Sequence, residues 1–136
     1  MELQVGVKIL LRNKEGKYLL LKRSALKFPE IGEKWDIVGG RINPGEPLIQ
    51  NLIREVKEET GLGINNEPAL VAAQDILRVK DRHVVRLTYV GNADGTPELT
   101  DEHTDFMWFT IEEMKELENL DIYLKELLDR NVLRES

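Results

Sequence analysis

The stretch GRINPGEPLIQNLIREVKEETGL, residues 40–62, decides how the rest of the sequence is interpreted. Asn43-Pro44-Gly45 supplies turn chemistry, and Pro47 suits the first position of a helix, where a missing backbone N–H costs no helical hydrogen bond. The residues that follow have helical spacing up to about Thr60, and Gly61 is typical of a helix C-terminus. The stretch therefore predicts a turn, a helix and a stop, with a dense group of charges near the end of the helix.

Apolar and acidic residues share one face of this predicted helix. At about 100° per residue, one stripe holds the apolar side chains of Leu48, Ile49, Leu52, Ile53 and Val56. Glu59 projects between Leu48 and Leu52, while Glu55 and Glu58 lie at the edges of the stripe. The three carboxylates are therefore expected to border the buried face of the helix.

The charges on this helix have an ordinary interpretation and a functional one. Glu and Lys are good helix formers, and a helix of mixed charge usually faces water. Glu55 and Glu59, however, are like charges one turn apart, which costs about 0.2–0.5 kcal/mol on an exposed helix and more where water is excluded. They also lie near the helix C-terminus, where the helix dipole favours cations. A divalent cation such as Mg²⁺ would remove this cost, because carboxylate oxygens are its usual protein ligands.

Strand-like patterns precede and follow the helix. The alternation from Leu3 to Ile9 predicts a strand with one buried face, and Tyr18 to Arg23 should pair back on it as a hairpin. A polar loop from Ser24 to Lys34 precedes the short strand WDIV, which should end in a tight turn at Gly39-Gly40. Later strands are predicted at residues 69–79, 83–90 and 105–109, a charged turn at 80–82, and helices opening at Thr110 and covering 122–130. This order predicts a mixed α/β layered domain.

Length and composition narrow the class of protein. The 136 residues suit one domain, residues 1–136, and a content of 41% hydrophobic and 32% charged residues describes a soluble globular chain. The formal net charge of −6 disfavours a nucleic-acid polymer as partner. The sequence has no cysteine, which excludes disulfides and thiol nucleophiles, and it has no apolar run of bilayer length. We therefore expect a cytoplasmic protein that binds no membrane, as a monomer or a homodimer.

The spacing within residues 40–62 resembles that of a known family. Gly40 is followed after five residues by Glu46, and after seven more by REVKEETGL, residues 54–62. Every specified position of the Nudix box, GX5EX7REUXEEXGU with U an aliphatic residue, is matched. A chance match in a chain of this length is on the order of one in a million. The chain is identified as a member of the Nudix hydrolase family, MutT-like in its small size, and departs from many members in having Val38 where they have proline.

The resemblance implies a fold, a reaction and a set of metal ligands. The fold would be the α/β/α sandwich of Nudix proteins, in which the box forms a loop-helix-loop beside a mixed β-sheet. The reaction would be Mg²⁺-dependent hydrolysis, with Mn²⁺ as an alternative, of a nucleoside diphosphate linked to another group. The implied metal ligands are the Gly40 carbonyl, Glu55, Glu58 and Glu59. Arg54 would orient a carboxylate, and Glu46 would support the loop–helix geometry.

The reaction also needs a general base, because water must lose a proton as it attacks a phosphorus surrounded by negative oxygens. Two candidates stay open: Glu58 in the box, and Glu102 in the loop DEHTD. Asp101, Glu102 and Asp105 around His103 could form a mobile lid that supplies a base or an extra metal ligand. The alternative for most of them, Glu102 excepted, is a solvated turn before a strand.

Residues outside the box are candidates for binding the substrate. Arg23 could pair with a substrate phosphate, although a surface charge at a strand end is equally expected. Asn119 and Asp121 occupy the part of the chain where some family members read the edge of the base. Three aromatic side chains could stack on a base but are more often part of a core: Phe28, Trp35 and Trp108.

Two substrate markers of the family are missing. ADP-ribose hydrolases often carry a proline beyond the box, and dinucleoside polyphosphate hydrolases a tyrosine, whereas residues 77–80 are Leu-Arg-Val-Lys. The small size and the absence of an added N-terminal domain favour a nucleoside triphosphate, oxidised ones included, cleaved to monophosphate and pyrophosphate. The alternatives are an ADP-ribose, NDP-sugar or dinucleoside polyphosphate substrate, and a module that binds a nucleotide without cutting it. Such modules commonly lose a box carboxylate, and this chain retains them all.

Overall fold

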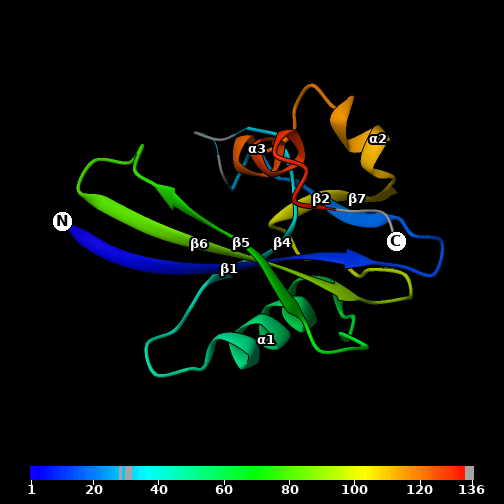
Figure 1. Cartoon of the computed structure of the whole chain (residues 1–136), viewed down its shortest axis with the longest axis horizontal. Coiled ribbons are helices and arrows are strands. Elements are labelled where there is room, and N and C mark those ends of the chain that lie inside the picture. Colours follow the sequence, from blue (N-terminus) through cyan, green and yellow to red (C-terminus); the bar gives the residue numbers. More distant parts are fainter. Residues whose placement is uncertain (28, 30–31, 134–136) are drawn as a thin grey trace.

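A strongly twisted mixed sheet organises the computed structural model, which describes residues 1–27, 29 and 32–133 (Figure 1). Seven strands are present in the described residues: β1 (Glu2–Arg12), β2 (Tyr18–Arg23), β3 (Trp35–Asp36), β4 (Val38–Arg41), β5 (Ala69–Ile76), β6 (Arg82–Asn92) and β7 (His103–Phe109). Three helices accompany them: α1 (Leu48–Thr60), α2 (Ile111–Lys115) and α3 (Ile122–Asp129). In that part of the chain, no helix has both the length and the apolar character needed to cross a bilayer.

The centre of the sheet is a long parallel pair. β1 runs beside β6 from Glu2 opposite Arg82 to Arg12 opposite Asn92. The other pairings are antiparallel, and the strand order is β3-β2-β1-β6-β5, with β4 also on β1 and β7 on β2. The predicted hairpin of β1 with β2 is confirmed, and β5 pairs with β6 across the predicted charged turn. The connection from β4 to the edge strand β5 carries α1, and β7, which follows β6 in the chain, lies beside β2.

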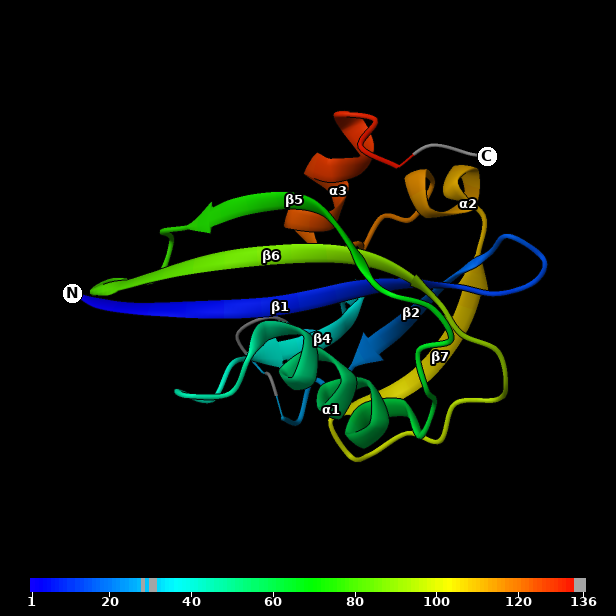
Figure 2. The same ribbon diagram turned by 60° about the horizontal axis from the view of Figure 1, so that its bottom comes forward.

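The helices cover opposite faces of this sheet (Figures 1 and 2), which confirms the predicted α/β/α arrangement. α1 packs on one face, where Leu52 and Val56 join the inward side chains of β1 such as Ile9. α2 and α3 pack on the other face, where Met114, Leu124 and their neighbours surround Leu10. Successive residues of β1 thus enter different cores, as expected of a strand buried on both faces.

The strand at residues 35–41 differs from the sequence prediction. We expected WDIV to end in a tight turn at Gly39-Gly40, but the backbone continues as β4 to Arg41. Lys8 pairs with Gly39, and Val7 pairs with Gly40, so β1 holds this segment as a strand. The physical reason is that Gly39 adopts a φ of 144°, which only glycine reaches easily, and so passes close to the β1 backbone.

Gly39→Ala is expected to lower the free energy of unfolding by about 3 kcal/mol or more. A Cβ at this position would overlap the carbonyl oxygen of Val7 and also meet the Lys8 backbone at 2.8 Å. The measurement is urea denaturation of the whole chain. Gly63→Ala is the matched control, because no atom lies within 4 Å of a Cβ there, and a change of less than about 1 kcal/mol is expected. Equal stability of the two variants would contradict the argument.

Helix α1 begins and ends as the sequence indicates, with two corrections. Gly61 ends it in the left-handed conformation, with a φ of 73°, as predicted. Pro47 occupies the N-cap position and not the first helical position. The buried face is also narrower than the predicted stripe, since Leu48 and Ile53 are 36% and 48% exposed. Polar side chains are buried instead: Glu59 accepts from the Gly39 N–H of β4, and Asn51 accepts from the Asn43 N–H in the loop that follows β4.

Candidate active site

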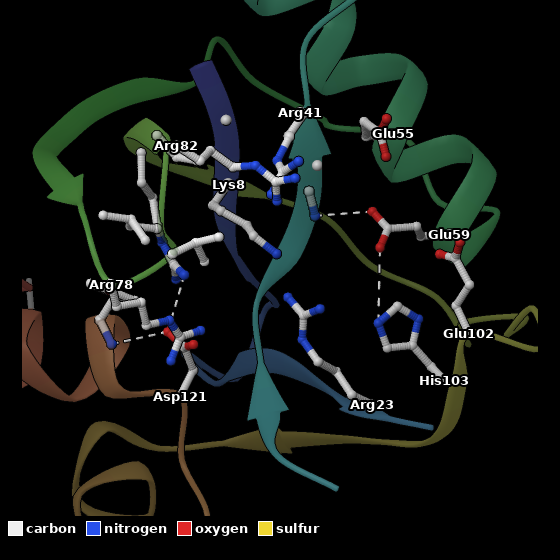
Figure 3. Close-up of a pocket in the computed structure, with 18 residues that line it drawn as sticks. Lys8, Arg23, Arg41, Glu55, Glu59, Arg78, Arg82, Glu102, His103 and Asp121 are labelled. Atoms are coloured by element: carbon white, nitrogen blue, oxygen red, sulfur yellow. Dashed lines mark hydrogen bonds and ion pairs between the residues drawn. The ribbon is translucent and has the colours of Figure 1, made fainter. Parts of the chain in front are cut away.

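A pocket of about 720 Å³ opens where five elements meet (Figure 3). They are the central strands β1 and β6, strand β4, helix α1 and the start of helix α3. The loop before β7 and the β5–β6 turn complete its rim. Its acidic side is formed by Glu55 and Glu59 of α1, the backbone of Gly40, and Glu102 at the turn before β7. We refer to Gly40, Glu55, Glu59 and Glu102 as the acidic wall.

Glu59 is the most enclosed carboxylate of the acidic wall. It is 7% exposed and accepts a hydrogen bond from the Gly39 N–H at 3.0 Å. Burial raises the pKa of Glu59 from an ordinary value of 4.5 to about 8, against the opposing effect of Lys8 and with a further rise from Glu55. A buried group that resists ionisation in this way gains most from a nearby cation.

Glu55 lies against Gly40. A Cβ placed on Gly40 would meet the Glu55 carboxylate at 2.9 Å, so the glycine lets the helix carboxylate approach the strand backbone. Burial raises the pKa of Glu55, and the neighbouring Arg54 opposes this effect. The predicted ligands Gly40, Glu55 and Glu59 therefore lie on one side of a single pocket.

Arg54 binds Glu46 and Glu58, the two glutamates of the box that are not part of the acidic wall. Its Nε and Nη2 atoms each donate to Glu46 at 3.1 Å, and Nη1 donates to Glu58 at 2.9 Å and lies 3.3 Å from Glu55. The hydrogen bonds to Glu46 raise the pKa of Arg54 above its ordinary value. The Glu58 side chain is 59% exposed and is not among the described residues that line the pocket. In this structure Arg54 thus directs Glu58 away from the acidic wall.

His103, to which the sequence assigned no ligand role, completes a potential metal site with Glu59 and Glu102. One ligand atom from each of the three lies within 4.8 Å of the others. His103 Nε2 is 3.9 Å from Glu59 Oε1, and the buried Nδ1 has no hydrogen-bond partner in the part of the chain that the structure describes. Burial, with the charges of Lys8 and Arg23, lowers the pKa of His103 to about 4. The imidazole is therefore neutral at pH 7 and can offer a lone pair.

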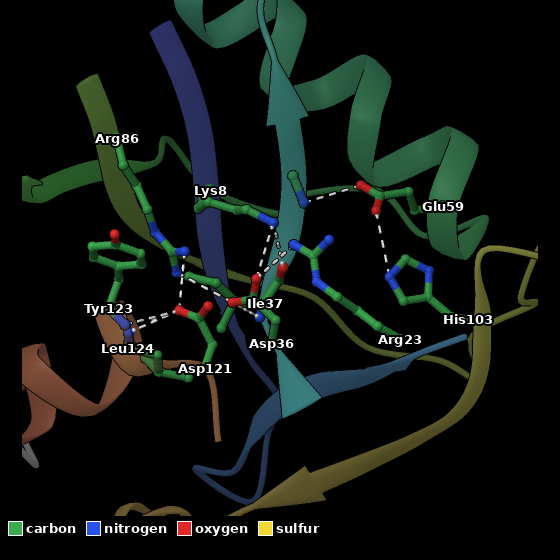
Figure 4. Close-up of polar contacts among 11 residues, drawn as sticks. Lys8, Arg23, Asp36, Ile37, Glu59, Arg86, His103, Asp121, Tyr123 and Leu124 are labelled. Carbon is green, nitrogen blue, oxygen red and sulfur yellow. Dashed lines mark hydrogen bonds and ion pairs between the residues drawn. The ribbon is translucent and has the colours of Figure 1, made fainter. Parts of the chain in front are cut away.

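A buried charge network forms the floor beside the acidic wall (Figure 4). Asp36, 1% exposed, accepts from Arg23 at 2.9 Å, from Arg86 at 3.2 Å and from Lys8 at 3.3 Å. Arg86 reaches Asp121 at 3.0 Å. Burial alone would raise the pKa of Asp36, but Lys8, Arg86 and Arg23 outweigh it and hold that pKa below its ordinary value. Sequence reasoning missed Lys8, Asp36 and Arg86, although charged residues inside apolar strands were a visible signal.

Two of the three predicted substrate-binding residues line the pocket, and the third does not. Arg23 and Asp121 both line the pocket, each already paired within the charge network. Asp121 also caps α3 by accepting from the N–H groups of Tyr123 and Leu124. Asn119 is not among the described pocket residues, and its side chain instead donates to the Glu33 carbonyl at 3.0 Å. It therefore supports a loop in this structure.

The aromatic candidates fall outside the pocket or outside the described residues. Trp35 is 9% exposed and packs edge-on against Phe109 at 5.4 Å, in the core beneath α2 and α3. Trp108 packs against the core beneath α1. Both side chains therefore contribute to packing, which is the role that the sequence analysis favoured. Phe28 lies outside the residues that the structure describes.

The donor set of the acidic wall fits a hard divalent cation. Carboxylate groups come from Glu55, Glu59 and Glu102, and the backbone of Gly40 lines the pocket with them. Lys8 opposes the effect of burial on the pKa of Glu59, but burial lowers the pKa of its own ammonium, and the ammonium binds Asp36 and the Ile37 carbonyl. Glu59 would therefore still gain from another cation. His103 would add a nitrogen donor, which a transition metal such as Mn²⁺ accepts more readily than Mg²⁺ does.

Metal affinity is expected to rise with pH up to about pH 8. With a pKa of about 8, Glu59 is mostly protonated at pH 6, and a metal ion must displace that proton to bind the carboxylate. Mn²⁺ affinity, measured by isothermal titration calorimetry at pH 6 to 9, should increase by about tenfold per pH unit below pH 8 and then level off. The same affinity at pH 6 and pH 8 would contradict this assignment.

Comparisons with known proteins agree with the geometry of the site. The NUDIX domain family matches residues 2–130. The fold superposes on the crystal structure of a MutT protein from Methanosarcina mazei Go1 with a TM-score of 0.84 and 29% identity, covering 95% of this chain and 92% of that one. A MutT NUDIX hydrolase from Burkholderia pseudomallei gives a TM-score of 0.80 at 25% identity, covering 96% and 99%. The chain belongs to the NUDIX domain family.

A curated relative points in the same direction over a shorter stretch. A Bacillus subtilis (strain 168) protein named "Putative 8-oxo-dGTP diphosphatase" is 36% identical over 56 residues. That stretch is 41% of this chain and 34% of the relative, so the match spans about a third of the length of the relative. Together with the acidic wall, these similarities identify the chain as a MutT-like member of the NUDIX domain family.

Proposed function

We propose that this enzyme hydrolyses a nucleoside triphosphate, in the presence of Mg²⁺, to the monophosphate and pyrophosphate. The observation that carries the proposal is that one pocket joins the acidic wall to a floor of cations that includes Lys8 and Arg23. Carboxylates suit the cations that accompany a polyphosphate, and arginine and lysine suit its oxygens. A pocket with both is suited to a metal-bound phosphate chain.

Each part of the pocket has a proposed role in the reaction. A divalent cation held by Glu55, Glu59 and the Gly40 carbonyl would neutralise phosphate charge and acidify the attacking water. Arg54 fixes the position of Glu55 through the 3.3 Å contact. Arg23, at the edge of the network, faces the pocket and is placed to contact a phosphate oxygen. Asp121 would contribute to binding the nucleoside.

Glu102 is the general base that the geometry favours. It lines the pocket and lies next to Glu59 and His103, whereas Glu58 is exposed and bound to Arg54. The Glu102 carbonyl accepts from the Ser24 N–H at 2.9 Å, which ties the turn to the end of β2. A base on an anchored turn can meet a water molecule at a fixed position. Glu58 remains the alternative, because a metal ion could draw it away from Arg54.

A nucleoside triphosphate is proposed because the name of the Bacillus subtilis relative contains one, 8-oxo-dGTP. 8-Oxo-dGTP is the first oxidised nucleotide to test. The test is a panel of ordinary and oxidised triphosphates, ADP-ribose, NDP-sugars and dinucleoside polyphosphates with Mg²⁺, followed by identification of the products. A triphosphate cleaved fastest, to monophosphate and pyrophosphate, is the expected result. A clear preference for ADP-ribose would contradict the proposed triphosphate substrate. Nucleotide binding without turnover would contradict the proposed enzymatic activity.

A further inference from the structure

Three arginines line the same pocket next to the acidic wall, and none of them has a role in the account above. Arg41 ends β4, Arg78 follows β5, and Arg82 begins β6 after the turn. We refer to Arg41, Arg78 and Arg82 as the arginine cluster. In Figure 3 the Arg41 side chain extends from the Gly40 strand toward Arg82, on the opposite side of the pocket from Glu102 and His103. Two segments far apart in the sequence thus bring guanidinium groups together.

The arginine cluster lacks acidic partners, unlike the other arginines of the pocket. Among the described residues, no carboxylate oxygen lies within 4.0 Å of any of its three guanidinium groups. Arg86, by contrast, pairs with Asp36 and with Asp121. Burial and the positive charge of Arg82 lower the pKa of Arg41, with Glu2 opposing them. Arg41 and Arg82 therefore repel each other in a chain with a net charge of −6, where carboxylates are plentiful.

The surroundings of the cluster keep it open toward the pocket. Gly6, opposite Arg41 in the β1–β4 pairing, also lines the pocket, and a Cβ there would meet its nearest atoms only at 3.8 Å. The Arg78 guanidinium lies 5.4 Å from the centre of the Tyr123 ring, which supports it from one side through a cation–π contact. An open space lined by guanidinium groups that are held in place is the arrangement expected of an anion-binding site.

We propose that the arginine cluster binds the terminal phosphoryl groups of the substrate, those released as pyrophosphate. This inference rests on the proposed function and adds the part of the site that recognises the leaving group. A phosphate chain whose cleaved bond lies at the acidic wall places its terminal oxygens beyond the metal ions, where guanidinium groups can donate paired hydrogen bonds. Two consequences follow: triphosphates are bound in preference to monophosphates, and pyrophosphate is a product inhibitor.

The direct test is binding of pyrophosphate to the whole metal-free chain, measured by isothermal titration calorimetry in EDTA. Arg82→Ala and Arg78→Ala should each weaken pyrophosphate binding by about tenfold or more. Arg130→Ala is the matched control, because Arg130 is an exposed arginine on the C-cap of α3, paired with Glu126 at 3.6 Å, and should leave the affinity unchanged. A nucleoside monophosphate should bind the wild type and the two cluster variants equally. Wild-type pyrophosphate affinity in Arg82→Ala and Arg78→Ala would overturn the proposal.

Kinetics separate this inference from the proposed function. If the enzyme hydrolyses triphosphates, Arg82→Ala should raise the inhibition constant of pyrophosphate by about tenfold, and Arg82→Lys should recover part of that loss. Triphosphate hydrolysis with unchanged pyrophosphate inhibition in Arg82→Ala would overturn the arginine cluster alone. Arginine-dependent pyrophosphate binding without any hydrolysis would support the cluster and overturn the proposed function.

Discussion

Glu59→Gln is expected to lower triphosphate turnover by about 10³-fold while the fold is retained. Glu59 is the most buried carboxylate of the acidic wall, and it forms the potential metal site with Glu102 and His103. Glutamine can still accept the hydrogen bond from the Gly39 N–H, but it carries no charge for a cation. The measurement is the steady-state rate at saturating Mg²⁺, together with a thermal melt in EDTA.

The melt distinguishes lost chemistry from lost structure. The folded-state pKa of Glu59, about 8, lies above the ordinary 4.5, so the native state holds a proton that the unfolded state releases. Stability of the metal-free wild type is therefore lost as pH rises from about 4.5 to 8, and Glu59→Gln, which cannot ionise, should be at least as stable at pH 8.

A carboxylate far from the pocket provides the matched control for the turnover measurement. Glu112→Gln changes an 80% exposed carboxylate on α2 and should keep wild-type turnover. Glu58→Gln separates the two candidate bases, because a loss of turnover by orders of magnitude would support Glu58 and turnover near that of the wild type would support Glu102. Wild-type turnover in both Glu58→Gln and Glu59→Gln would contradict the enzyme mechanism.

Asp36→Ala is expected to lower the free energy of unfolding by about 3–5 kcal/mol. The substitution leaves the cationic groups of Lys8, Arg23 and Arg86 in the floor of the pocket without their shared carboxylate. Removing one partner of a buried ion network is costly because the remaining charges have already lost their water. Urea denaturation at pH 7 measures the loss.

The control for Asp36→Ala is an exposed ion pair. Asp129 lies 3.5 Å from Lys125 with both side chains more than half exposed, and Asp129→Ala should cost less than about 1 kcal/mol. If the two variants lost similar stability, the buried network would have no special role in the fold.

The Nudix box could be read from the sequence because its geometry is local. Helix periodicity placed Glu55 and Glu59 beside the apolar face of α1, and the left-handed Gly61 ends the helix where expected. The same periodicity overestimated the apolar stripe, because it could not show that β4 offers a backbone N–H to Glu59. The sequence placed Glu58 with the other two glutamates, whereas in the structure Arg54 holds it outside the pocket.

The rest of the site could not be predicted because it depends on contacts between distant strands. Asp36 meets Lys8 across the sheet and Arg86 from a strand fifty residues later in the chain. The arginine cluster likewise joins the end of β4 to the β5–β6 turn. Neither arrangement has a periodic pattern, and each needs the pairings of β1 with β4 and β6.

The most direct test of the central claim is ³¹P NMR of one triphosphate, 8-oxo-dGTP, incubated with the enzyme in the presence and absence of Mg²⁺. A metal-dependent, pyrophosphate-releasing hydrolase predicts that the signals of the monophosphate and pyrophosphate grow together with Mg²⁺ and stay absent in EDTA. Release of orthophosphate and a diphosphate, or the same rate in EDTA, would contradict the claim.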